Sequence, residues 1–108
     1  MTKQDRLRYR SEFQRVSREA KRWVGQRLCI DCRKGSSALK LGITAPRKYG
    51  SAPERSRFKR LIREVFRLHR AHLPQSWEIL VMPRQRAKGA SFFDIEAEFY
   101  LFLNTHAQ

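Results

Sequence analysis

Basic side chains dominate residues 47–70, and their spacing suits contact with a polyanion. Nine Lys or Arg residues lie in this segment, against two Glu residues. In an α-helix beginning near Pro53, at about 100° per residue, the large apolar side chains would gather on one side and most cations on the other. The cations of this arc are Lys59, Arg60, Arg63, Arg67 and Arg70. Like charges at helical spacing repel each other, so phosphates lying against the arc would relieve that repulsion, although a merely solvated face is the alternative.

Two cysteines could suggest redox chemistry or half of a zinc site. Cys29 and Cys32 form a C-x-x-C pattern. They lie in an alternating segment typical of a strand, where residues three apart point to opposite faces. His69 and His72 follow at a distance that matches no common zinc spacing. We therefore expect two ordinary thiols, with His69 as a packing residue.

Hydrolytic chemistry by the chain itself finds little support in its acidic residues. The ten carboxylates are scattered, and no Gly-rich phosphate loop is present. A metal-dependent nuclease would need grouped carboxylates to hold its ions. Asp94 and Glu98 are expected to share an exposed helix face and to balance local charge. We expect no catalytic residue and no metal site in this chain.

The distribution of charge narrows the class of partner. The formal net charge is +14, and twelve of these excess charges lie in residues 1–22 and 47–70. We expect the 108-residue chain to be a single domain over residues 1–108. Such an asymmetric charge distribution indicates that its partner is nucleic acid or an anionic membrane. The membrane is less favoured because no apolar run approaches about 18 residues and the N-terminus lacks a secretory signal. We expect a cytoplasmic protein.

Hydrophobic periodicity predicts six elements in the order helix, strand, strand, helix, strand, helix. The expected ranges are 12–22, 28–32, 39–45, 53–72, 77–82 and a last helix capped by Ser91. The first two strands should form an antiparallel hairpin through the turn at residues 34–37. The order predicts a small α+β domain whose mixed sheet packs on helices and leaves one face open. Aromatic and basic residues beside that face would suit single-stranded RNA.

Residues 41–67 carry a family resemblance. The segments Leu-Gly-Ile-Thr at 41–44, Arg-Lys-Tyr-Gly-Ser-Ala at 47–52 and Arg-Ser-Arg-Phe-Lys-Arg at 55–60 resemble the signature of the bacterial ribonuclease P protein subunit. Residues 12–16 resemble that family's first helix. Ser56 stands where the family usually has Asn, and Ser17 stands where its first helix often has an aromatic residue.

The resemblance implies a protein cofactor for a ribozyme that removes the 5′ leader from precursor tRNA. It implies that the RNA subunit is catalytic and holds most of the Mg²⁺, and that no protein partner is required. It assigns RNA-subunit contacts to Arg55, Ser56, Arg57, Lys59, Arg60, Arg63 and Arg67. It assigns Phe13, Arg47 and Lys48 to a cleft for the single-stranded leader.

Arg57 and Arg60 lie off the apolar arc of the basic helix. We therefore expect charge reversal at these two positions to weaken RNA binding with little loss of fold.

The alternative function is that of an RNA-binding protein of ribosomal type, which shares the composition but needs no leader cleft. A membrane-active protein is disfavoured by the regular core pattern.

Overall fold

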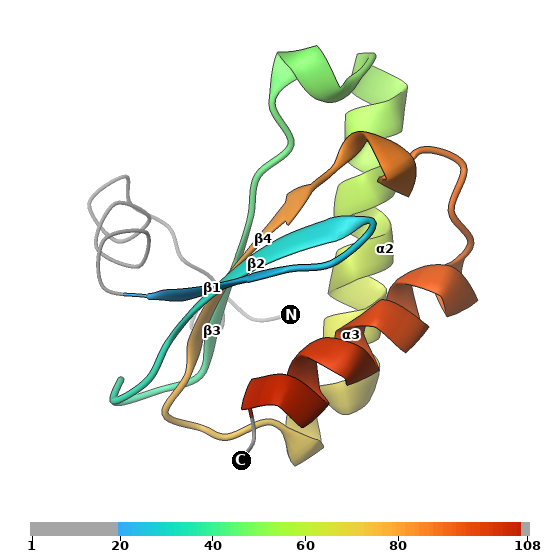
Figure 1. Ribbon diagram of the computed structural model, residues 1–108. Coiled ribbons are helices and arrows are strands. Elements are labelled where there is room, and N and C mark those ends of the chain that lie inside the picture. Colours follow the sequence, from blue (N-terminus) through green and yellow to red (C-terminus); the bar gives the residue numbers. More distant parts are fainter. Residues whose placement is uncertain (1–19, 107–108) are drawn as a thin grey trace.

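The computed structural model describes residues 20–106, which form a sheet and two α-helices (Figure 1). The strands are β1 (Lys21–Val24), β2 (Leu28–Arg33), β3 (Lys40–Ile43) and β4 (Glu78–Pro83). The α-helices are α2 (Ala52–His69) and α3 (Phe92–His106), and the 3-10 helices are η2 (Arg47–Tyr49), η3 (Arg70–His72) and η4 (Gln85–Ala87). The α+β class and the mixed sheet predicted from the sequence are confirmed.

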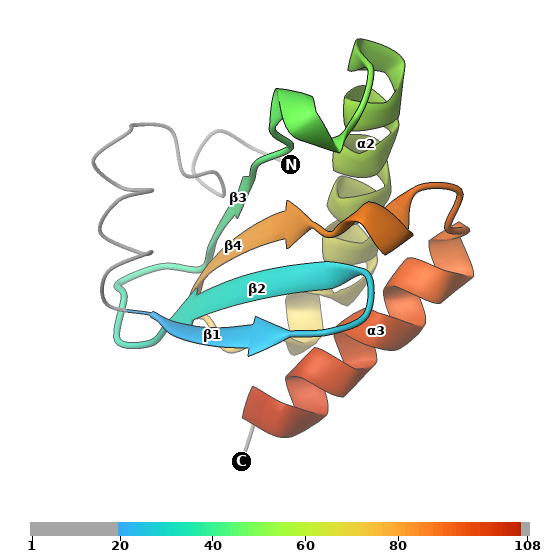
Figure 2. The same cartoon turned by 45° about the horizontal axis from the view of Figure 1, so that its top comes forward.

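The sheet has the strand order β1-β2-β4-β3, and Figure 2 shows the four strands side by side in this order. β2 pairs antiparallel with both β1 and β4, whereas β3 pairs parallel with β4. The predicted hairpin between β2 and β3 is therefore wrong, because β4 lies between them. β4 is the most apolar strand, with Ile79, Leu80 and Val81 all buried. An interior position in the sheet gives its backbone N–H and C=O groups hydrogen-bond partners on both edges.

The first strand of the sheet was not predicted. Residues 12–22 were expected to be helical, but Lys21 and Arg22 already belong to β1, and the rest of that range lies outside the described residues. β1 forms the hairpin with β2, closed by a hydrogen bond from the Gly25 N–H to the Leu28 carbonyl at 2.8 Å. Four residues with two cations at their start carry too weak an alternation to predict a strand.

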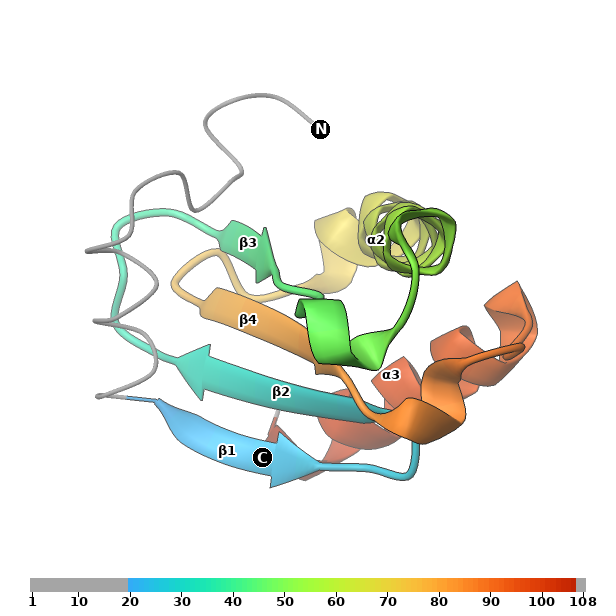
Figure 3. The same cartoon turned by 90° about the horizontal axis from the view of Figure 1, so that it is seen from above.

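Helices α2 and α3 cover the same face of the sheet, as Figure 3 shows from above. The core lies between these layers. One row of cross-strand neighbours on this face runs through Trp23, Ile30, Val81 and Ile43, and all four contribute to the core cluster. Phe102 of α3 lies against Trp23, with ring centroids 5.9 Å apart.

The predicted helix limits hold closely. The 53–72 prediction corresponds to α2 followed by η3, and the last helix begins at Phe92 as its predicted cap requires. The Ser91 hydroxyl accepts a hydrogen bond from the Asp94 N–H at 3.1 Å, while Asp94 accepts from the Ser91 N–H at 3.0 Å. These reciprocal bonds satisfy backbone donors that the helix itself leaves unpaired.

Glu98 does not lie on an exposed face as the sequence suggested. Its carboxylate is buried and accepts the Arg27 N–H through both oxygens, at 2.8 and 3.1 Å. The bond joins α3 to the β1–β2 turn across 71 residues of sequence. A buried carboxylate needs such donors, so Glu98 is a structural residue that helps to fix the hairpin on α3.

Candidate nucleic-acid interface

The start of α2 is built by a capping box. The Ser51 hydroxyl accepts from the Glu54 N–H at 3.3 Å, and the Glu54 carboxylate accepts from the Ser51 N–H at 2.9 Å. This backbone bond holds the pKa of Glu54 below its ordinary value, because it favours the ionised carboxylate. Pro53 lies in the first turn, where its missing N–H costs no helical bond. The cationic helix therefore begins at a defined residue.

The two-sided character of α2 is confirmed. Phe58, Ile62, Val65 and Phe66 are buried against the sheet and α3. The outward cations Arg60, Arg63 and Arg67 are exposed, as is Ser56. Leu68 of the same helix is exposed, because it lies at the edge of the apolar arc.

Arg67 differs from the other exposed cations of α2. Its guanidinium forms an ion pair with Glu64 one turn away, which raises the pKa of Arg67 and lowers that of Glu64. Both side chains are largely exposed, so the pair contributes little stability. A phosphate at Arg67 would compete with Glu64, whereas Arg60 and Arg63 form no ion pair within residues 20–106.

Arg57 is exposed yet bonded to another element of the fold, whereas Arg55 is partly withdrawn from solvent. The Arg57 Nη2 donates to the Ala90 carbonyl at 2.7 Å, which ties α2 to the segment preceding α3. Arg55 is half-buried, and its Nε is buried without a hydrogen-bond partner within the described part of the chain. The expectation that charge reversal at Arg57 causes little loss of fold stays a prediction, and the bond to Ala90 is the contact that such a change would remove.

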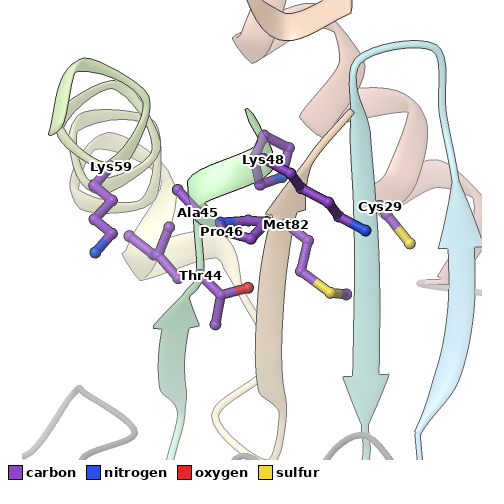
Figure 4. Close-up of a pocket in the computed structure, with 9 residues that line it drawn as sticks. Cys29, Thr44, Ala45, Pro46, Lys48, Lys59 and Met82 are labelled. Atoms are coloured by element: carbon purple, nitrogen blue, oxygen red, sulfur yellow. The ribbon is translucent and has the colours of Figure 1, made fainter. Parts of the chain in front are cut away.

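A groove of about 580 Å³ opens beside the N-terminal half of α2 (Figure 4). Lys48 of η2 and Lys59 of α2 contribute its cations. The apolar part of its lining comes from the ends of β3 and β4 and the residues that follow them. The lining residues are Cys29, Ile43, Thr44, Ala45, Pro46, Lys48, Lys59, Met82 and Pro83. An apolar floor with cations beside it can accept a flat base and its phosphates.

The structure distributes the predicted leader residues unevenly around this groove. Lys48 lines it, whereas Arg47 is exposed on the same 3-10 helix and does not line it. Phe13 lies outside the described residues. Lys59, predicted to contact the RNA subunit, also lines the groove. Sequence reasoning missed Met82 as a lining residue, although its alternation with the core residue Val81 placed it on the opposite face of the sheet.

Contacts with η4 hold η2 in place beside the groove. Gln85 donates from Nε2 to the Lys48 carbonyl at 3.2 Å. The Lys88 ammonium lies 5.6 Å from the ring centre of Tyr49, and this ring packs on Phe58 of α2 at 5.8 Å. The backbone of Lys48 is thus fixed from two sides, while its side chain stays exposed.

The second face of the sheet, opposite the helices, is more polar and less aromatic than expected. Arg22 pairs with Asp31 at 2.8 Å, and Arg33 pairs with Glu78 at 3.2 Å. Both carboxylates are almost inaccessible to solvent. Trp23, the one aromatic residue of β1–β4, faces the core instead. These strands therefore offer no stacking ring on this face.

The thiols and histidines behave as structural groups. Cys32 faces the core, and burial raises the pKa of its thiol to about 11. Cys29 lines the groove on the opposite face, and burial raises its pKa as well. Both are free cysteines. His69 contacts Glu96 at 2.8 Å and the Tyr100 ring, which confirms it as a packing residue between α2 and α3.

Residues 20–106 contain no group of three or more His, Cys, Asp or Glu side chains placed to bind a metal ion. Neither described α-helix is long and apolar enough to cross a bilayer.

Comparison with known proteins identifies a family. Residues 1–106 match the Ribonuclease P family. Among curated relatives, the Ribonuclease P protein component of Dictyoglomus turgidum is 36% identical over 97 residues, covering 87% of this chain and 82% of that protein. The one from Thermotoga maritima is 35% identical over 86 residues, covering 79% and 74%.

Solved structures agree with the sequence relatives. The Staphylococcus aureus RNase P protein superposes with a TM-score of 0.84 at 26% identity, covering 94% of each chain. The Thermotoga maritima RNase P protein gives a TM-score of 0.83 at 28% identity, covering 93% of this chain and 96% of that one.

Proposed function

The chain belongs to the ribonuclease P protein family and is a protein subunit of that endoribonuclease, and we propose that it binds RNA on two adjacent surfaces. One surface is the outward side of α2, and the other is the groove beside it. The proposal rests on the position of Lys59, because this residue is part of α2 and its side chain also lines the groove. Family membership also favours this role over that of an RNA-binding protein of ribosomal type.

The outward side of α2 is the proposed contact for the RNA subunit. Arg60 and Arg63 are exposed, point away from the core and can meet phosphates directly. Ser56 is exposed and offers one hydroxyl where the family usually has an amide. Arg55, Arg57, Lys59 and Arg67 complete the proposed set. Arg67 would exchange its Glu64 partner for a phosphate, and Arg57 would bind while keeping its bond to Ala90.

The groove is the proposed seat of the single-stranded leader of precursor tRNA. Its cations, Lys48 and Lys59, would neutralise two phosphates, and Met82 would support a base. Arg47 would guide the strand at the groove's edge. Phe13 as a stacking residue stays a prediction from the sequence, because no described residue tests it. A single strand fits better than a duplex, because an unpaired base can lie flat on an apolar floor.

Catalysis is proposed to reside in the RNA subunit together with its Mg²⁺. The protein's proposed contribution is to hold RNA and to offset its charge. A cation-rich protein between leader and ribozyme lowers the repulsion between these polyanions. A cytoplasmic location stays a prediction.

Reconstitution tests the proposal. The chain, freed of RNA, is mixed with a bacterial ribonuclease P RNA at low Mg²⁺, and cleavage of precursor tRNA at the mature 5′ end is measured. We expect cleavage that needs both components. Metal-dependent cleavage by the protein alone, or no stimulation of the RNA, would overturn the proposal.

A matched pair of variants tests the groove. Lys48→Glu should weaken binding of precursor tRNA by about tenfold or more, since a charge-assisted contact contributes roughly 1.5–3 kcal/mol. Binding of mature tRNA, which lacks the leader, should change little. Lys21→Glu makes the same charge change on the edge strand β1 and should affect neither. Equal weakening of precursor and mature tRNA by Lys48→Glu would place the leader elsewhere.

A further inference from the structure

The side chains that line the groove beside α2 are rich in hydrogen-bond donors and poor in acceptors. Lys48 and Lys59 end in ammonium groups, which donate but cannot accept. Thr44 has a hydroxyl, which can turn to donate or to accept. The other lining residues bring no carboxylate, amide or imidazole; they are Cys29, Ile43, Ala45, Pro46, Met82 and Pro83. Within the described part of the chain, the groove is therefore an apolar floor with donors at its rim.

The carbonyls of η2 and the thiol of the groove add little accepting capacity. The Pro46 carbonyl accepts the Tyr49 N–H at 2.9 Å, and the Lys48 carbonyl accepts from Gln85 Nε2 at 3.2 Å. Burial raises the pKa of the Cys29 thiol, so this group stays a neutral S–H at neutral pH instead of a thiolate. These acceptors are thus already engaged or intrinsically weak.

The carboxylates on the same face of the sheet are engaged by other residues. Asp31 forms an ion pair with Arg22 at 2.8 Å, and Glu78 forms one with Arg33 at 3.2 Å. Both acids are buried, and neither lines the groove. The described lining therefore offers no carboxylate that could accept hydrogens from a bound base.

The two ammonium groups approach the groove from different elements. Lys59 projects from α2 and Lys48 from η2, and Figure 4 shows their side chains on opposite sides of Thr44. Lys59 belongs to the helix proposed to meet the RNA subunit, so Lys48 is the cation left to reach the edge of a base lying on Met82. An ammonium has three donors, so Lys48 can contact a phosphate and a base together.

A rim of donors suits a base that presents acceptors. Guanine presents O6 and N7 as acceptors, and uracil, like thymine, presents O4. Adenine and cytosine present an amino group, whose hydrogens would face those of the ammonium. We propose that the groove selects a keto base, guanine or uracil, over an amino base at the leader position that it holds. The inference rests on the proposed leader groove and goes beyond it by naming the class of base.

Precursor tRNAs that differ in a single leader nucleotide test the preference in the reconstituted holoenzyme. Each leader position is varied in turn among the four bases, and the dissociation constant is measured. At one position we expect guanine and uracil to bind about three- to tenfold more tightly than adenine and cytosine, because one hydrogen bond is gained. Equal binding of all four bases at every position, or a preference for adenine or cytosine, would overturn the proposal.

The RNA subunit without the protein, at raised Mg²⁺, is the control for that comparison. It should bind the four precursors alike at the position concerned. The same keto preference in the absence of the protein would show that the RNA subunit reads the base, and the proposal would then be wrong.

A matched pair of variants assigns the preference to the Lys48 ammonium. Lys48→Arg keeps a cation that only donates, so it should keep the preference. Lys48→Gln offers an accepting carbonyl as well as a donating amide group, so keto and amino bases should then differ by less than about twofold. A full preference in Lys48→Gln, or its loss in Lys48→Arg, would contradict the role of the ammonium.

Base analogues test which atoms are read. Inosine keeps O6 and N7 of guanine but lacks its amino group, so it should bind as tightly as guanine. Diaminopurine has an amino group where guanine has O6, so it should bind as weakly as adenine. The reverse order would overturn the proposal, because selection would then depend on amino groups.

Lys48→Glu separates failure of the base preference from failure of the groove. If this variant weakens precursor and mature tRNA equally, the leader lies elsewhere and both proposals are wrong. If it weakens only precursor tRNA while the four bases bind alike, the groove holds the leader and only the base preference is wrong.

Discussion

Helices α2 and α3 perform the same task on their inner sides and different tasks on their outer sides. Each packs aromatic and aliphatic side chains on one face of the sheet, represented by Phe66 and Phe102. Outward, α2 presents exposed arginines, whereas α3 presents acidic residues and exposed apolar side chains such as Phe93 and Leu101. The core requires only one side of each helix, so the composition of the other side can differ between the two.

The inner sides should prove equivalent when a large side chain is removed. Phe66→Ala and Phe102→Ala each delete a buried ring, with an expected loss of about 3–5 kcal/mol in the free energy of unfolding. Urea unfolding measures both. Phe93→Ala removes an exposed ring and should cost under about 0.5 kcal/mol. A small effect of Phe102→Ala would show that α3 is peripheral to the core.

The outer sides should differ in their effect on RNA binding. Arg60→Glu combined with Arg63→Glu should weaken binding to the RNA subunit by about a hundredfold or more, since each charged contact contributes roughly 1.5–3 kcal/mol. Each lost phosphate contact should also lower the slope of log affinity against log salt by about 0.7–0.9. Asn104→Glu with Thr105→Glu makes exposed changes on α3 and should have a far smaller effect. An unchanged salt slope in the α2 variant would mean that these arginines are only solvated.

Arg57 should combine both kinds of effect. Arg57→Ala loses its bond to the Ala90 carbonyl, so we expect a stability loss of about 1–3 kcal/mol together with weaker RNA binding. Arg60→Ala, on the exposed side of the same helix, should weaken RNA binding without changing the midpoint of thermal unfolding. Equal stability of the two variants would indicate that the Ala90 contact is not stabilising in solution.

The caps of the two helices should be equivalent. Ser51→Ala and Ser91→Ala each remove the hydroxyl that accepts a backbone N–H, and each should cost about 1 kcal/mol. Chemical denaturation compares them directly. A negligible loss at one helix would show that its first turn is held by tertiary contacts instead.

Acid should weaken both caps together. The pKa values of Glu54 and Asp94 are lowered, chiefly by backbone hydrogen bonds from Ser51 and Ser91. Their stabilisation is fully present above their unfolded pKa values, near 4.5 and 3.8. It is lost as the pH falls through the lower folded values. Glu54→Gln with Asp94→Asn should flatten this pH dependence, as followed by the unfolding midpoint between pH 6 and about pH 3.

Local features could be predicted from the sequence because they depend on residues a few positions apart. The buried side of α2, its start at Ser51 and the cap at Ser91 follow from helical geometry alone. The placement of Cys29 and Cys32 on opposite faces followed from strand geometry. The same locality explains the resemblance over residues 41–67, which carried the family assignment.

Only the tertiary structure decided which distant residues meet. β4 separates β2 from β3 because the most apolar strand gains most from two neighbours, a competition that local alternation does not record. That insertion brings Met82 beside Cys29 and places Lys48 and Lys59 around one groove. Glu98 became a buried partner of Arg27 for the same reason, since a carboxylate's surroundings depend on elements far away in the chain.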